Sequence, residues 1–285
     1  MAEPERLRRP ATPKTKSVLE QMVGRYARHY RIPQGRVRGW ISFMVLGGAL
    51  ERVKDAGGVP AFIVKGGVAL ELRLRVRART TKDFDATFRA EFGEMLQALD
   101  RALAEPYSDF RLMRRGEIRE LGGKAKRIEI RLEYHGRPWA TVPMEVSAGE
   151  SQDVEAELVP ATDLSEFGIN GPEYIHCLSA RYQIAQKIHA ATTPQRGGRV
   201  SERYRDLVDL WLLRELGTKL VDVREACEDV FRRRAMQPWP PAVVVPASWA
   251  EPFARLAAEV GLPIHDVEEA AQNLRGYIEE IASAR

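Results

Sequence analysis

Cysteine is scarce in this sequence. The 285 residues include only Cys177 and Cys227, which are far apart and form no CxxC pair. A disulfide framework or a cysteine-based zinc site is therefore not expected, and the composition favours a reducing cytoplasm. The chain also lacks any run of roughly 18 apolar residues, the length that a membrane-spanning helix requires. We therefore expect a cytoplasmic protein that has no membrane partner.

An apolar segment is also missing behind the basic N-terminus, MAEPERLRRPATPKTKS, so a signal peptide is not expected. We expect residues 1–16 to form a flexible basic tail. Lysine is scarce as well, with nine residues, and arginine supplies most of the positive charge. The net charge is only +4 and the pI is about 9.1. This mild basic bias permits a nucleic-acid partner without requiring one.

Several common signatures of nucleotide-binding and hydrolytic sites are absent. No GxGxxG occurs, and the Gly66-Gly67 pair is not followed by Gly-Lys-Ser/Thr. A Rossmann dinucleotide site and a Walker A loop are therefore disfavoured. His176 and His189 do not stand at HExxH spacing, and no Ser-His-Asp or Cys-His arrangement is indicated. We interpret both histidines as structural.

The most informative residues present are Asp83 and Asp85, which we expect on a strand over residues 83–88. Side chains two apart on a strand point to the same face, so these two carboxylates are expected to lie side by side. Like charges that close repel each other unless a cation offsets them. Hard divalent cations prefer oxygen ligands. The pair therefore predicts a site for Mg²⁺ or Mn²⁺.

A possible phosphate site precedes this acid pair. The short apolar run 61–64 reads as a buried strand and ends in Lys65-Gly66-Gly67. A glycine pair lets a phosphate approach the backbone closely, and Lys65 would lie beside it. Glycine pairs also simply turn a chain, and Lys65 taken alone is equally compatible with a surface lysine.

Glu145 is the candidate for a third acidic ligand. It lies on an expected strand over residues 139–147, in the phase opposite to Ala140, Val142, Met144 and Val146. Those four residues are expected to face a core, so Glu145 faces away from it. Two-metal chemistry usually needs more than one carboxylate pair. The alternative is an ordinary solvated strand glutamate.

A second polar cluster lies in the C-terminal half. Asp206 and Asp209 stand three residues apart, on one face of an expected helix. Beside Arg203 and Arg205, such a pair is more often an ion-pair network than a catalytic unit. Lys187, on another expected helix, can either reach a triphosphate or pair with one of these acids.

The pattern of the chain changes at its middle. We expect an α/β domain over residues 17–150, an acidic linker over 151–172 and a helical domain over 173–285. The expected helices of the first domain are 17–29, 36–56, 68–74 and 91–103. Its strands are 61–64, 83–88, 127–134 and 139–147, the last two joined as a hairpin by a three- or four-residue loop. The second domain is expected to contain helices 173–191, 201–216, 221–235, 249–259 and 265–283.

Three motifs taken together resemble a known family. KGGVALELR…RTTKDFD, VPMEVS and QIAQKIHA…YRDLVDL are similar to the AbiEii/MenT nucleotidyltransferase-like toxins of bacterial toxin–antitoxin systems, particularly the mycobacterial MenT branch. The resemblance covers roughly residues 60–280. It implies a polymerase-β-like nucleotidyltransferase domain of α/β (α+β) class with a mixed sheet, followed by a helical C-terminal lobe. It further implies transfer of nucleotides from an NTP to the 3′ end of tRNA, which blocks aminoacylation and translation.

The resemblance assigns roles to individual residues. It implies metal ligation by Asp83 and Asp85, with Glu145 in the place of the third carboxylate. It implies phosphate contacts from Lys65 and Lys187 and an essential acid at Asp206. Gly66 and Gly67 are expected to offer backbone N–H groups to the phosphates.

The chain departs from the family pattern after the two glycines, where many relatives have Ser or Thr. Val68 stands there and removes a hydroxyl contact to phosphate. Thr80 and Thr81 directly precede Lys82-Asp83. The resemblance implies a cognate antitoxin with kinase character, and by position we favour Thr81 over Thr80 as the phosphorylated residue. The alternative is that both threonines only cap the strand.

A basic surface is expected on the N-terminal helices and would contact the tRNA backbone in a salt-sensitive manner. Its residues are Arg25, Arg28, Arg31, Arg36 and Arg38. Such a run is more often a solvated face. Two other functions remain open: a nucleic-acid-binding regulator without catalysis, and a nucleotidyltransferase that modifies a protein or only binds GTP.

Overall fold

The computed structural model describes residues 10–55, 57–121, 125–148, 155–194 and 201–285. The chain divides into two compact units, each described here by itself. Unit 1 comprises residues 1–72 and 80–177, and unit 2 comprises residues 73–79 and 178–285. The expected linker over 151–172 therefore lies within unit 1. The short segment 73–79, from the first half of the sequence, belongs to the helical unit.

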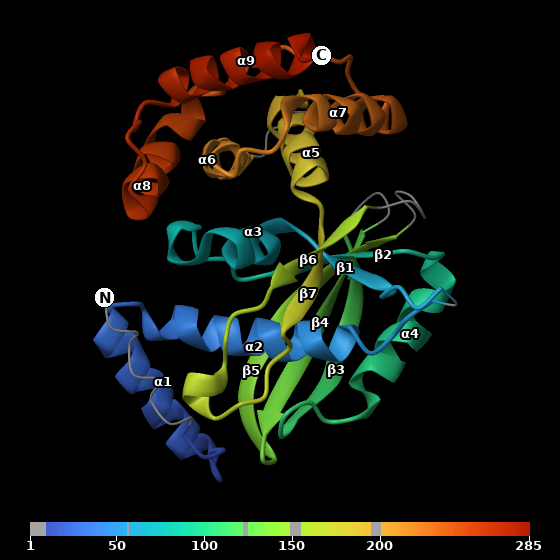
Figure 1. Cartoon of the computed structure of the whole chain (residues 1–285), viewed down its shortest axis with the longest axis vertical. Helices are drawn as coiled ribbons and strands as arrows, with labels where there is room; N and C mark the ends of the chain where they lie inside the picture. Colours follow the sequence, from blue (N-terminus) through green and yellow to red (C-terminus); the bar gives the residue numbers. More distant parts are fainter. Residues whose placement is uncertain (1–9, 56, 122–124, 149–154, 195–200) are drawn as a thin grey trace. The chain divides into compact units, whose positions relative to one another are not determined.

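Unit 1 is built on one mixed sheet of seven strands (Figure 1). The strands are β1 (Phe62–Val64), β2 (Phe84–Phe88), β3 (Phe110–Glu120), β4 (Ala125–Tyr134), β5 (Arg137–Ala148), β6 (Ala156–Pro160) and β7 (Tyr174–Leu178). Their order is β3-β4-β5-β2-β1-β7-β6. β2 pairs in parallel with β5 and antiparallel with β1, and β1 pairs in parallel with β7. The expected mixed α/β fold is confirmed.

Four helices accompany this sheet in the described part of unit 1: α1 (Lys16–Tyr30), α2 (Gln34–Leu50), α3 (Gly66–Leu74) and α4 (Phe92–Ala104). α2 and α4 contact the sheet, and α1 packs against α2. α2 crosses the strands in Figure 1, and every residue from Trp40 to Leu50 is buried. A helix that is apolar on all sides belongs in the middle of a core. α1 instead buries one stripe. Its N-cap is Thr15, whose hydroxyl accepts a hydrogen bond from the Val18 backbone N–H at 3.3 Å.

In the hairpin of β4 and β5, the residues that face the core are those that the alternation predicts. Ile128, Ile130 and Leu132 are buried on β4, and Val142, Met144 and Val146 are buried on β5. The connection is tighter than expected, because β4 ends at Tyr134 and β5 begins at Arg137. His135 and Gly136 have φ values of 46° and 71°, as a two-residue type I′ turn requires.

Several regions differ from the expected secondary structure. β6 is a strand within the stretch 151–172, where only a linker is expected from the sequence. β3 was not foreseen, because its sequence FRLMRRGEIRE is mostly charged and its register shifts between Arg115 and Arg119. β7 occupies the start of the helix expected at 173–191, and the helix itself begins only at Ala180. β7 buries Ile175, Cys177 and Leu178, and periodicity cannot separate so short a buried strand from a helical turn.

Unit 2 is helical, as expected. Its helices are α5 (Ala180–Thr192), α6 (Tyr204–Arg214), α7 (Leu220–Arg234), α8 (Ala250–Val260) and α9 (Val267–Ser283). Local signals fix several ends: α8 stops at Gly261, with a φ of 70°, and Asp266 caps α9 by accepting from Glu268 and Glu269 N–H. No helix in the described ranges combines the length and apolarity needed to cross a membrane.

Candidate active site

The acid pair lies at the start of β2. The strand begins at Phe84, so Asp83 directly precedes it and Asp85 is its second residue. Phe84 and Ala86 are buried in the core, whereas Asp85 is half-buried. The alternation of the strand therefore turns Asp85 away from the core.

Strand pairing brings Glu145 to the same place. β2 and β5 pair in parallel with Asp85 opposite Glu145 and Thr87 opposite Ser147. Paired residues share a face of the sheet, so the carboxylates of Asp85 and Glu145 are neighbours. The Glu145 side chain is 33% exposed and that of Asp83 is 40% exposed. The three predicted acids thus gather at one half-open edge of the core.

A guanidinium that the sequence did not single out lies among these acids. Arg127 on β4 stands opposite Glu145 in the β4–β5 register. Its Nη2 donates to Asp83 Oδ1 at 2.6 Å, and its Nη1 donates to Glu145 Oε1 at 3.2 Å. Arg127 alternates with the buried Ile128 on β4 and so faces away from the core, and the strand register identifies its partners.

Lys65 lies on the same side of the sheet. Its backbone N–H donates to Asp85 O at 2.9 Å, and its Nζ donates to Ser147 Oγ at 2.5 Å. Ser147 Oγ is also 3.3 Å from Thr87 Oγ1. The ammonium is therefore held two strand positions beyond Glu145, on the face that carries the acids. The predicted phosphate contact of Lys65 stays a prediction.

The glycine pair is packed against the acid site. Gly66 begins α3 with a φ of 61°, and a Cβ placed there would lie 2.0 Å from Asp85 Oδ2. A Cβ on Gly67 would lie 2.4 Å from Thr81 Oγ1. Both glycines are thus required by the protein's own side chains. Their predicted contact with phosphate is a further role that stays a prediction.

The two threonines before the acid pair differ in environment. Thr80 is exposed, whereas Thr81 is half-buried and its hydroxyl donates to Asp83 O at 3.3 Å. Thr81 Oγ1 therefore lies between the N-terminal turn of α3 and the backbone of a candidate metal ligand. Val68, the departure from the family pattern, is buried in the core.

The second polar cluster forms a buried ion-pair network within unit 2. Lys187 Nζ donates to Asp206 Oδ1 at 2.9 Å and to Asp209 Oδ2 at 2.7 Å. Arg79 donates to both oxygens of Asp209 at 3.0 Å, and Arg203 donates to Asp206 at 3.2 Å. Asp209 is fully buried. The ion-pair interpretation accounts for these contacts, and a phosphate contact of Lys187 stays a prediction.

Charge pairing dominates the protonation of this network. Burial alone would lower the pKa of Lys187, but Asp206 and Asp209 outweigh it, and the pKa is raised. Burial would likewise raise the pKa of Asp206, but Lys187 and Arg203 outweigh it, and the pKa is lowered. Both groups are therefore held in their charged forms.

The donor set of unit 1 suits a hard divalent cation. Asp83, Asp85 and Glu145 supply carboxylate oxygens, the ligands that Mg²⁺ and Mn²⁺ prefer. Among the described residues, no three or more His, Cys, Asp or Glu side chains are already arranged around a metal position. The Arg127 guanidinium lies between Asp83 and Glu145 instead. That space therefore accepts a cation, and a metal ion would have to displace the guanidinium.

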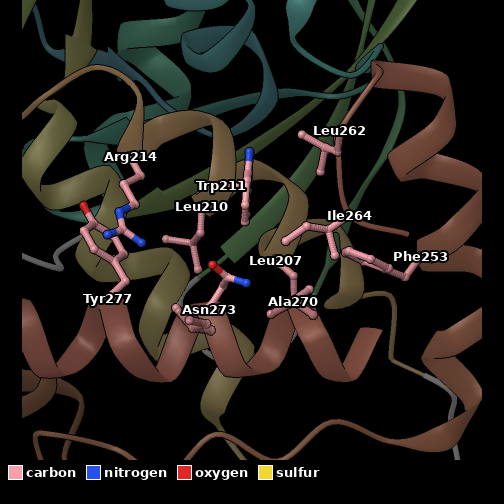
Figure 2. A pocket seen from close by; sticks show the side chains of 11 residues that line it. Leu207, Leu210, Trp211, Arg214, Phe253, Leu262, Ile264, Ala270, Asn273 and Tyr277 are labelled. Atoms are coloured by element: carbon pink, nitrogen blue, oxygen red, sulfur yellow. The ribbon is translucent and has the colours of Figure 1, made fainter. Parts of the chain in front are cut away.

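Two hollows in unit 2 do not resemble substrate sites. One, between α6, α8 and α9, has a volume of about 20 Å³, room for roughly one water molecule. Figure 2 shows Arg214 beside Tyr277 at one end of it and Phe253 at the other. A second, of about 500 Å³, is lined by residues of 191–194 and 237–246, none of them charged. The first hollow is too small for a triphosphate although Arg214 lines it, and the residues that line the second supply no cation for one.

Comparison with known proteins identifies the family. The model of the family described as the nucleotidyl transferase AbiEii toxin of type IV toxin–antitoxin systems matches residues 48–274. No curated protein matches the chain. MenT4, a nucleotidyltransferase toxin from Mycobacterium tuberculosis H37Rv, is similar in structure with 17% identity and a TM-score of 0.47, over 95% of this chain and 99% of that one.

An antigenic nucleotidyltransferase-like protein from Paracoccidioides brasiliensis is similar with 16% identity and a TM-score of 0.40, over 68% of this chain and 88% of that one. Both structural similarities are low, so the assignment rests on the family match. That match spans most of the sequence and includes the acid site and the buried network. The chain belongs to the AbiEii nucleotidyltransferase toxin family of type IV toxin–antitoxin systems.

Proposed function

We propose that the protein is a metal-dependent toxin that transfers nucleotides from an NTP to the 3′ acceptor end of tRNA, and so blocks aminoacylation and translation in the cytoplasm. The observation that carries the proposal is the register of Asp85 opposite Glu145, with Asp83 at the start of the same strand. Three carboxylates on neighbouring strands, beside a lysine and a glycine turn, are the parts that nucleotidyl transfer requires.

Each part has a role in transfer. Asp83, Asp85 and Glu145 would hold Mg²⁺ or Mn²⁺, which would offset phosphate charge when bound. Lys65 extends along the same face and offsets charge on the triphosphate of the incoming NTP. Gly66 and Gly67 let that triphosphate lie close to the start of α3. Glu145 accepts the proton of the attacking ribose hydroxyl. The hydroxyl oxygen bonds to the α-phosphorus of the NTP, the bond between the α- and β-phosphates breaks, and pyrophosphate leaves.

One candidate surface for the tRNA contact is formed by exposed arginines of α1 and by its C-cap residue, Arg31. Arg25, Arg28 and Arg31 are exposed and have no ion-pair partner within the described ranges. Arg36 and Arg38 are engaged inside unit 1: Arg36 Nε is 3.0 Å from Glu71 Oε1, and Arg38 bonds Glu20 and Trp139 O. The first three therefore remain available for phosphate groups, whereas the last two have structural partners.

Family membership implies an antitoxin partner, and we propose that it silences the toxin by phosphorylating Thr81. A phosphate adds about −1.5 to −2 charges and three acceptor oxygens. At Thr81 it would stand next to Asp83 and repel the triphosphate. Mass spectrometry of the toxin co-expressed with its operon neighbour is expected to find phosphate on Thr81. Unmodified Thr80 and Thr81 in a neutralised toxin would instead indicate neutralisation by binding.

Labelled NTPs test the proposed reaction. Each of the four NTPs is incubated with the protein and Mg²⁺, once with total tRNA and once with total protein. We expect label on tRNA, lost with EDTA and in Asp85→Asn. Asp100→Asn is the matched control, because Asp100 is an exposed acid of α4 paired with Arg114. Label on protein would mean that the acceptor is a protein and not tRNA. NTP binding without consumption would remove the enzymatic proposal.

A further inference from the structure

We propose that Arg127 is a built-in counter-ion of the acid site, which holds Asp83 and Glu145 together until a divalent cation displaces it. The inference rests on the metal-dependent site proposed above and adds a competitor for that metal. No motif in the sequence marked Arg127, and its part in the site follows entirely from strand register.

The contacts of Arg127 place one cation between two candidate metal ligands. Its guanidinium reaches Asp83 Oδ1 at 2.6 Å and Glu145 Oε1 at 3.2 Å through two different nitrogens. Asp85, Glu145 and Arg127 form one row across β2, β5 and β4, because Asp85 pairs with Glu145 and Glu145 pairs with Arg127. Arg127 therefore occupies the space in which a metal would meet these carboxylates.

The charge balance explains why the guanidinium holds this position and why it can be replaced. The three carboxylates carry a formal charge of −3. Arg127 contributes a single positive charge between Asp83 and Glu145, and its Nε also lies 3.9 Å from Glu129 Oε1. Lys65 contributes another positive charge on the same face of the sheet. A divalent ion offsets two of the carboxylate charges and binds closer to the oxygens, so it interacts more strongly with the cluster. Arg127 is 31% exposed, so its side chain can move into water without crossing the core. β4 is paired on both sides, so the movement involves the side chain and not the strand.

Two opposite effects of one substitution follow from this arrangement. Without the guanidinium, the carboxylates of Asp83 and Glu145 repel each other in metal-free protein, so Arg127→Gln is expected to lower the melting temperature in EDTA. The same change removes a cation that competes with the metal, so Mn²⁺ is expected to bind more tightly. If Arg127 only supported the metal ligands, its substitution would lower both the melting temperature and the Mn²⁺ affinity. If Arg127 were an ordinary solvated arginine, its substitution would change neither.

Arg131 provides a matched control on the same strand. It lies on the same face of β4 four residues further along, and its side chain is 32% exposed. Its Nη2 bonds Glu133 at 2.7 Å, away from the three acids. Arg131→Gln therefore removes the same charge and one ion pair without opening the acid site.

The experiment measures Mn²⁺ binding to the full chain by electron paramagnetic resonance, together with melting temperature in EDTA. Asp85→Asn identifies the signal that belongs to the site. We expect Arg127→Gln to bind Mn²⁺ roughly tenfold more tightly than the parent, while melting at a lower temperature in EDTA, and Arg131→Gln to match the parent in Mn²⁺ affinity.

Unchanged or weaker Mn²⁺ binding by Arg127→Gln would overturn the proposal, as would the absence of a site signal in every variant. The tRNA labelling assay is read separately. A parent that labels tRNA while Arg127→Gln gains no Mn²⁺ affinity keeps the proposed function and removes the role of Arg127. If the parent binds Mn²⁺ and Arg127→Gln gains affinity as expected, but the parent transfers no nucleotide, the role of Arg127 is kept and the proposed function is removed.

Discussion

Gly66 is the residue at which backbone conformation and the acid site meet. Its φ of 61° lies in the left-handed region, and the carboxylate of Asp85 occupies the space that a side chain would need. A glycine at this position therefore serves two purposes. It lets β1 turn into α3, and it lets Asp85 approach the backbone of that turn.

The first prediction concerns this position. Gly66→Ala is expected to lower the free energy of unfolding by about 2 kcal/mol, because a non-glycine residue at positive φ costs about 1–2 kcal/mol and the new Cβ displaces Asp85. Transfer activity is expected to be lost as well. Gly93→Ala in α4 is the control: nothing lies within 4 Å of its Cβ. Urea denaturation should show that Gly93→Ala raises the free energy of unfolding by about 0.5–1 kcal/mol.

At the scale of single elements, two exposed rows of arginine compete as the RNA surface. The first row comprises Arg25 and Arg28 of α1 and Arg31 at its C-cap. The edge strand β3 presents Arg111, Arg115 and Arg119, exposed and without an ion-pair partner among the residues described. These three stand opposite Glu133, Glu129 and Arg127 in the β3–β4 register. The β3 row therefore lies on the sheet face that carries the acid site.

The second prediction separates these rows by RNA binding of full-length Asp85→Asn protein. Changing the three β3 arginines to Gln is expected to weaken tRNA binding and to reduce the slope of log K against log salt by about 2, since each phosphate contact contributes about 0.7–0.9. The α1 triple substitution is expected to have a smaller effect. A loss confined to the α1 variant would place the RNA on the N-terminal helix.

The third prediction concerns α6 and pH. The lowered pKa of Asp206 means that its contribution to stability is present above the unfolded pKa near 4 and is lost as the pH falls through the folded value. The raised pKa of Lys187 gives a contribution that is present below about 10.4 and is lost as the pH rises through its folded value. The network is therefore fully stabilising between these limits.

Asp206→Asn is expected to destabilise unit 2 by about 3 kcal/mol at pH 7, because it breaks a buried ion pair. That difference from the parent should shrink below about pH 4, where the unfolded carboxyl is protonated. Hydrogen exchange of the α6 amides at each pH measures this difference in stability between Asp206→Asn and the parent. Glu251→Gln serves as control, because its ion pair with Arg255 is fully on the surface and contributes about 0–1 kcal/mol. A pH-independent effect of Asp206→Asn would contradict the charge-based explanation.

At the scale of the whole molecule, the helical unit is not one continuous stretch of sequence. Residues 73–79 belong to it, and Arg79 bonds Asp209 through two nitrogens although 130 positions separate them. Arg73 also donates to Gln183 Oε1 and to Leu178 O, both at 2.7 Å. The segment 73–79 is thus joined to unit 2 by the hydrogen bonds of Arg73 and Arg79.

The fourth prediction compares two arginines of this segment. Arg79→Met leaves one partner fewer for the fully buried Asp209 and is expected to reduce protection of the α6 amides by about 3 kcal/mol. Arg77→Met removes an exposed pair with Glu215 and is expected to change protection by less than about 1 kcal/mol. Equal effects in hydrogen exchange would mean that segment 73–79 is not an integral part of the helical unit.

Local periodicity was enough to predict much of this protein. Alternation correctly predicted which residues of β4 and β5 are buried and that Glu145 faces away from the core. Helical spacing predicted the positions of α6, α7, α8 and α9 to within a few residues. The acid pair and the glycine turn were visible because their residues are adjacent in sequence. Each of these features depends on neighbours within one or two turns or strand positions, which a sequence displays directly.

Only the tertiary structure decided which distant residues meet. Asp85 opposite Glu145, Arg127 between Asp83 and Glu145, and Arg79 on Asp209 are set by strand register and by packing between segments far apart in the chain. A register shift of one residue would turn Glu145 to the other face of the sheet without altering the pattern of its own strand. Register and long-range ion pairs are fixed by the core as a whole, so no local stretch of sequence specifies them.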